Sequence, residues 1–173
     1  MDIPLETICL WRIDGEFAQR SIITFLSKVL EEGDVVIFGA YEPTPELMIA
    51  LSNLGAVRHF HLPDFFTSFD FNRSEHPEGS AFELIVNKHL WNKILDLPDS
   101  ILRQTDIAFF FDHVLAYRPG TPRVPLISFH DAACGGTLYV SGLYSPEQAA
   151  AFAATLAGEA KEVRNPTLGD DIG

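Results

Sequence analysis

Two short pairs of carboxylate and imidazole side chains have the residue types and the spacing that chemistry requires. Asp112 and His113 lie in one β-rich run, and His130 and Asp131 end the next. A carboxylate beside an imidazole holds its tautomer and raises its basicity, as general-base and metal-ligand roles require. Cys134 follows shortly after and is a candidate nucleophile if a base lies beside it. These five residues are the candidates for catalysis.

Strand register decides whether these side chains meet. A turn that pairs Arg118 with Arg123 places His113 opposite Ser128. The histidine of the second strand, His130, is then diagonal to His113, and the two aspartates share the other face. A register shifted by one residue instead brings each aspartate towards the histidine of the neighbouring strand. Internal hydrogen bonding in the sheet explains such residues more simply, so we favour a structural role over catalysis.

A second group of candidate ligands follows a short β-rich run. His59 and His61 alternate along a strand and therefore point to one side, and Asp64 comes soon after them. Two imidazoles and a carboxylate can hold zinc. Ordinary surface histidines at a strand end are the favoured interpretation, so no metal and no cofactor are expected.

Residues 63–79 form a long segment without periodicity, rich in phenylalanine and carboxylates. Irregular segments longer than about 12 to 15 residues are uncommon in compact domains and tend to be functional or disordered. The rings either dock on the core as a lid or form aromatic anchors that grip a basic protein surface. The residues of this candidate binding surface are Asp64, Phe65, Phe66, Phe69, Asp70, Phe71, Glu75 and Glu78.

The charge balance restricts the partners. The chain carries 24 acidic and 12 basic side chains, a net charge of −12 that is spread along its length. Such a field repels nucleic acid and anionic membranes and attracts a basic protein partner. The phosphate-binding pattern G-x-x-x-x-G-K-[ST], the dinucleotide pattern G-x-G-x-x-G and the hydrolase pattern G-x-S-x-G are all absent from the sequence. An enzyme that uses a nucleotide is therefore disfavoured, and enzymatic activity in general stays open, with a non-enzymatic role favoured.

Hydrophobic periodicity predicts an α/β fold of mixed α+β character. A length of 173 residues suits one domain, expected over 1–164, with a flexible acidic tail over 165–173. The first half reads β-α-β-α-β, with strands at 7–13, 34–40 and 57–62 and helices at 17–30 and 45–54. Helical connections of this length favour parallel or mixed strand pairing.

The second half follows a different pattern. Ser80 and Glu83 have the spacing of a capping box, which predicts a helix from there to about Leu95, and a short turn of helix follows at 99–104. Three β-rich runs at 106–117, 124–130 and 137–141 predict an antiparallel meander. Ser145 and proline after it predict a C-terminal helix, with an edge strand near 162–163. The whole is one mixed sheet of about six to seven strands with four principal helices.

We expect a binding or inhibitory domain that occupies a basic partner through its acidic surface and the Phe-rich segment. In composition alone it is similar to immunity proteins and to inhibitors that mimic nucleic acid. A small enzyme or ligand-binding domain at the Asp/His residues is one alternative, and an accessory subunit of a larger assembly is another. Homo-oligomerisation stays open. The two cysteines lack ligand spacing, and no signal sequence or membrane span is recognised, so a cytoplasmic location is expected.

Overall fold

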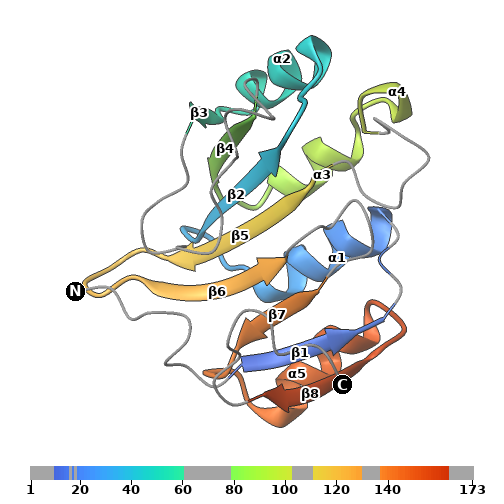
Figure 1. The fold of residues 1–173 in the computed structure, drawn as a ribbon, viewed down its shortest axis with the longest axis vertical. Coiled ribbons are helices and arrows are strands. Elements are labelled where there is room, and N and C mark those ends of the chain that lie inside the picture. Colours follow the sequence, from blue (N-terminus) through green and yellow to red (C-terminus); the bar gives the residue numbers. More distant parts are fainter. Residues whose placement is uncertain are drawn as a thin grey trace.

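The protein folds as a sheet with helices packed on one face (Figure 1). The computed structural model describes residues 10–15, 17, 19–60, 79–102, 111–129 and 137–163. The strands are β1 (Leu10–Asp14), β2 (Val35–Ala40), β3 (Val57–His59), β4 (Ser80–Ile85), β5 (His113–Arg118), β6 (Val124–Phe129), β7 (Leu138–Ser141) and β8 (Glu159–Val163). The helices are α1 (Gln19–Val29), α2 (Pro45–Asn53), α3 (Leu90–Leu95), the single-turn α4 (Asp99–Leu102) and α5 (Pro146–Ala154).

The described strands form one eight-stranded sheet in the order β3-β4-β2-β5-β6-β7-β1-β8. Every neighbouring pair is antiparallel, so the expectation of a mixed sheet with fewer strands is wrong. The helical crossovers do bring β1, β2 and β3 to run in the same direction. They are never neighbours, however, because β4 lies between β2 and β3, and the meander β5-β6-β7 lies between β2 and β1. The predicted meander itself is confirmed.

The strand β4 occupies a position where the sequence predicts the start of a helix. Phe82 and Leu84 alternate with Ala81 and Glu83, and the first two enter the core on the helix side of the sheet. All six residues of β4 pair with β2, which gives this segment a backbone ladder on its inner side. The Ser80 hydroxyl accepts a hydrogen bond from Arg58 Nε at 2.8 Å and caps no helix. Pairing in the sheet therefore overrides a local capping signal.

Two helices begin where their capping residues predict. The Thr44 hydroxyl accepts a hydrogen bond from Leu47 N at 3.2 Å, and proline follows at the first helical position of α2. Ser145 and Gln148 form a reciprocal capping box at the start of α5. These bonds satisfy backbone N–H groups that a helix leaves unpaired in its first turn.

The core lies between the sheet and its helices. In Figure 1 the sheet faces the reader, and α1, α3 and α5 lie behind it. Large apolar side chains of the helices meet those of the sheet in one cluster, which includes Phe25, Phe38, Leu51, Phe111 and Phe152. The opposite face of β2, β4 and β5 carries a smaller buried cluster: Val35, Ile37, Ala81, Leu115 and Tyr117.

The end of β1 and the turn before β8 approach so closely that both need glycine. A Cβ on Gly158 would lie 2.7 Å from the Cα of Gly15, and a Cβ on Gly15 would lie 2.6 Å from the Leu156 oxygen. The turn follows α5 through Ala157, which has a φ of 50°. Gly158 N then bonds to Ala153 O, and Ala157 N bonds to Ala154 O, as in a Schellman motif.

Candidate functional site

The first two candidate residues lie where β5 begins. Asp112 precedes the strand and His113 is its first residue, opposite Gly39 of β2. Leu115, and not His113, pairs with Ser128, so the register expected from the turn is wrong. The turn pairs Arg118 with Val124 and not with Arg123, and a bulge at Ala116 and Tyr117 shifts the pairing by one further residue. His130, Asp131 and Cys134 lie outside the described residues.

Tyr41, which follows β2, joins these two side chains. The Asp112 carboxylate accepts a hydrogen bond from Tyr41 N, with 2.7 Å between Oδ2 and the nitrogen. His113 Nε2 lies 2.8 Å from the Tyr41 hydroxyl, and which of the two donates depends on the tautomer of the imidazole. The two rings meet edge to face, with their centroids 5.1 Å apart. One tyrosine therefore ties the end of β2 to the start of β5.

The hydrogen bonds of Asp112 and His113 indicate what these two side chains can do chemically. His113 is 4% exposed, and its imidazole contacts a phenol, which is a neutral partner. One carboxylate oxygen of Asp112 accepts a hydrogen bond from a backbone N–H, and the backbone N–H of Asp112 donates to Gly39 O at 2.9 Å. These bonds tie the end of β2 to the start of β5. A catalytic role together with the second strand's residues stays a prediction.

The metal hypothesis rests on one described residue. His59 Nε2 lies 3.4 Å from a carboxylate oxygen of Glu83, which neighbours it on β4. His61 and Asp64 lie outside the described residues. Within the part of the chain that the structure describes, no three His, Cys, Asp or Glu side chains gather closely enough to hold a metal ion.

The proposed binding surface of the Phe-rich segment lies outside the described ranges. This applies to each of its residues: Asp64, Phe65, Phe66, Phe69, Asp70, Phe71, Glu75 and Glu78. The choice between a lid and a recognition patch therefore stays a prediction. The tail expected over 165–173 also falls outside these ranges.

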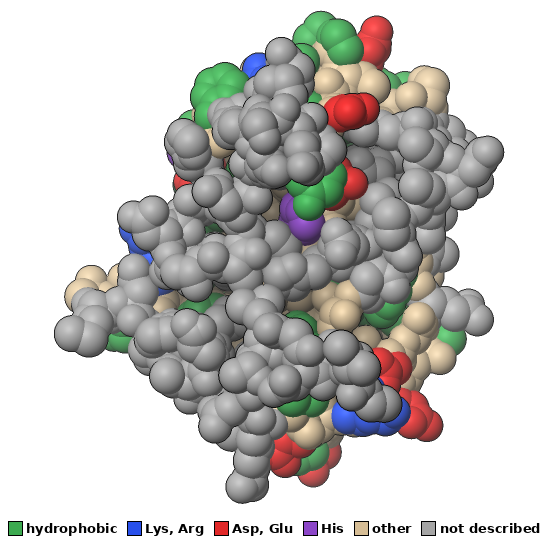
Figure 2. Space-filling view, viewed as in Figure 1, with side chains coloured by type: hydrophobic (Ala, Val, Ile, Leu, Met, Phe, Trp, Pro, Cys, Tyr) green, Lys and Arg blue, Asp and Glu red, His purple; other side chains and the backbone are tan. Residues whose placement is uncertain are grey.

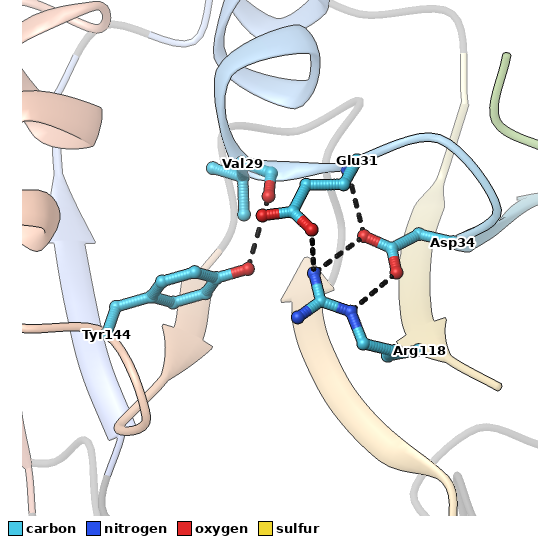
Figure 3. Close-up of polar contacts among 5 residues, drawn as sticks. All are labelled: Val29, Glu31, Asp34, Arg118 and Tyr144. Carbon is cyan, nitrogen blue, oxygen red and sulfur yellow. Dashed lines mark hydrogen bonds and ion pairs between the residues drawn. The ribbon is translucent and has the colours of Figure 1, made fainter. Parts of the chain in front are cut away.

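An ionic cluster around the buried Asp34 is the polar feature that sequence reasoning missed (Figure 3). Asp34, 2% exposed, precedes β2 and accepts two hydrogen bonds from Arg118 at the end of β5: Nε–Oδ1 at 2.9 Å and Nη2–Oδ2 at 3.2 Å. Glu31 N also donates to Asp34, at 2.8 Å, and the Glu31 carboxylate lies 3.2 Å from Arg118 Nη2. The hydrogen bond to Asp34 raises the pKa of Arg118, and desolvation only partly opposes it. A local sequence signal for this pair does not exist, because 84 positions separate its members.

Tyr144 lies beside this cluster and binds the end of α1. Its hydroxyl donates to Val29 O at 3.1 Å (Figure 3). Its own carbonyl accepts from Trp11 Nε1 at 3.0 Å. Burial raises the pKa of Tyr144 from 10.0 to about 12, although the nearby Arg118 acts in the opposite direction. Through its hydroxyl and its backbone carbonyl, Tyr144 joins α1, β1 and the turn before α5, and the hydroxyl stays neutral at ordinary pH.

The basic side chains near β1 and β8 are also taken up by contacts within the chain. Arg12 and Lys161 both bind Asp14, with N–O distances of 3.2 and 3.0 Å. Burial would raise the pKa of Asp14, but the hydrogen bonds from Lys161 and Arg12 outweigh it and lower that pKa below 3.8. The Asp14 carboxylate therefore forms ion pairs with two cationic side chains.

Two further arginines contact aromatic rings. Arg58 lies over Phe60, with 4.7 Å from its guanidinium carbon to the ring centre, and Arg123 lies over Tyr117 at 5.5 Å. Burial, and then the charge of Glu83, raise the pKa of Tyr117, while Arg123 opposes the shift.

Many carboxylates, in contrast, lie in solvent without a counter-charge. Figure 2 shows acidic side chains at both ends of one face, over α2 and over β1 and β8. Exposed carboxylates that form no ion pair among the described residues are Glu32, Glu42, Glu46, Asp96, Glu147 and Glu159. Three exposed lysines, Lys28, Lys88 and Lys93, likewise form no ion pair among the described residues, so the described surface carries only part of the negative excess of the sequence.

A depression between β6 and β7 offers no ligand site. It is lined by residues that include Pro125, Ser128, Tyr139 and Ser141, and it has no space for a water-sized molecule.

Among the described helices, none has the length and the apolar character needed to cross a membrane. Comparison with models of protein families, with curated proteins and with solved structures finds no match to this chain.

Proposed function

We propose that this protein is a binding or inhibitory domain that occupies a basic protein partner through its negative surface. The carrying observation is the net charge of −12, together with six exposed carboxylates that form no ion pair among the described residues. Arg118 forms an ion pair with the buried Asp34, and Arg12 and Lys161 both form ion pairs with Asp14. Glu46 of α2, Glu147 of α5 and Glu159 of β8 are exposed and form no ion pair among the described residues, so their field reaches solvent.

A cationic partner gains from this arrangement in two ways. The field accelerates encounter because it steers positive charge towards the surface before contact. Carboxylates that lack an internal partner also lose no ion pair when a lysine or arginine of the partner approaches. The Phe-rich segment, if it serves as an anchor, adds apolar contact area at the same interface.

The experiment that tests this proposal is capture from a cell lysate at low and high salt, followed by identification of the retained proteins. A matched variant replaces the exposed Glu32, Glu46, Glu147 and Glu159 with glutamine, which keeps side-chain size and removes four negative charges. We expect wild type to retain basic proteins at low salt, and both high salt and the variant to release them. Retention of acidic or neutral proteins, or retention indifferent to salt and to the variant, would contradict the proposal.

A further inference from the structure

The strand β8 forms one edge of the sheet. It pairs with β1 along five residues, and no described strand pairs with its outer side. Glu159, Lys161 and Glu162 are exposed, and in Figure 1 the strand is the outermost one at its end of the sheet. An edge strand presents every second backbone N–H and C=O group to whatever strand approaches it.

The charges across β1 and β8 are unevenly matched. Glu159 lies directly opposite Asp14, and two like charges in that position repel each other. Arg12 and Lys161 both bind Asp14, so Glu159 has no cation among the described residues. A basic side chain on the outer side of β8, opposite Glu159, would remove this imbalance.

A second copy of the chain carries such a side chain in the required position. In a continuous antiparallel sheet with the helices of both copies on one side, residues that face each other across the two-fold axis must point to the same face. If Ala160 lies on the axis, Glu159 of each copy faces Lys161 of the other. If the axis instead passes through Glu159 or through Lys161, that residue faces the same residue of the second copy, so two like charges lie opposite each other. A single register is therefore complementary in charge.

We propose that β8 pairs with β8 of a second copy in this register, which joins the two sheets into one. The pairing makes two Glu159–Lys161 contacts, related by the two-fold axis. On the helix side, Ala160 meets its own copy, and Glu162 faces a glycine, Gly158, which has no side chain to repel it. Self-association at β8 needs no basic partner, although Glu159 belongs both to this contact and to the acidic surface of the proposed function.

The helix behind the edge carries small side chains at several of its exposed positions. α5 packs against β8, and the exposed residues along it include Ala150, Ala151 and Ala154, whose side chains are small. The net charge of −12 acts against association, since both copies repel each other at long range. This repulsion is screened beyond about 8 Å at physiological salt, whereas cross-strand partners lie about 5 Å apart. A weak dimer is therefore expected at moderate salt.

The test is sedimentation equilibrium over a concentration series, with wild type, Glu159→Lys and the double variant Glu159→Lys/Lys161→Glu. We expect wild type to dimerise and Glu159→Lys to raise the dissociation constant about tenfold, because two opposite-charge pairs become two like-charge pairs. The double variant restores complementarity in the same register, so its dissociation constant returns to within about threefold of wild type. Glu159→Lys places its new charge beside Asp14, so the fold should persist, and thermal melting of each variant checks this.

Glu46→Lys on α2, at the far end of the sheet, is the matched control. It makes the net charge less negative by the same amount as Glu159→Lys, so net repulsion falls equally in both. If net charge governs association, both variants dimerise more strongly than wild type. Association weakened by Glu159→Lys alone points to the β8 contact. A wild type that is monomeric throughout, a Glu159→Lys variant that dimerises as well as wild type, or a double variant without recovery would each overturn the proposal.

Discussion

Replacement of Arg118 by methionine is expected to destabilise the fold far more than replacement of an arginine at the surface. Asp34 is 2% exposed, and Arg118 supplies two of the three hydrogen bonds described at its carboxylate. Loss of one member of a buried ion pair costs about 3–5 kcal/mol because the other charge stays buried. The side chain of Arg118 is 42% exposed, so water can replace part of its contribution. We therefore expect Arg118→Met to lower the free energy of unfolding by about 2–3 kcal/mol.

Urea unfolding followed by circular dichroism measures this difference. Arg12→Met is the matched control, because Arg12 binds Asp14 with 33% and 45% of the two side chains exposed, and it should cost less than about 1 kcal/mol. In the double variant with Asp34→Asn, the buried charge is gone while the amide oxygen can still accept from Glu31 N. The two substitutions should therefore be non-additive by about 1–2 kcal/mol. Equal losses for Arg118→Met and Arg12→Met, or strict additivity, would refute this reasoning.

Three further predictions concern the turn after α5 and the hydroxyl of Tyr144. Gly158→Ala should cost about 2 kcal/mol or more in urea unfolding, since the new Cβ would lie 2.7 Å from Gly15 Cα, and an unchanged midpoint would contradict this. Ala157→Gly should raise stability by about 0.5–1 kcal/mol, because alanine is strained at a φ of 50°, and a loss of stability would show that the strain is absent. Because the pKa of Tyr144 is raised in the folded state, its contribution is complete below pH 10.0 and declines as pH rises towards about 12. Tyr144→Phe should therefore lose stability less steeply than wild type over that range in thermal melts, and parallel slopes would count against the assignment.

Local signals in the sequence predict much of the secondary structure. Thr44 and Ser145 start α2 and α5 because each pairs a capping hydroxyl with proline at the next position. The short loop before Val124 correctly indicates an antiparallel hairpin between β5 and β6. These signals act between residues a few positions apart, so they need no knowledge of the tertiary fold.

Contacts between distant segments account for what the sequence could not predict. Ser80 and Glu83 mimic a capping box, but six ladder pairs with β2 make their segment a strand. The strand order follows from the fit of whole elements, which no local motif encodes. At the candidate site, the neighbours Asp112 and His113 can be identified from their type alone. Their shared partner Tyr41 belongs to a different strand end, 72 positions away from His113, and carries no recognisable pattern.

The rate of association with a captured basic protein, measured by stopped flow over a series of salt concentrations, tests most directly whether the acidic surface selects the partner. The account predicts an association rate constant that falls steeply as salt rises, and a shallower dependence for the variant with glutamine at Glu32, Glu46, Glu147 and Glu159. The dissociation rate constant should change much less in both proteins. Association equally fast at low and high salt, or the same slope in wild type and variant, would contradict the account.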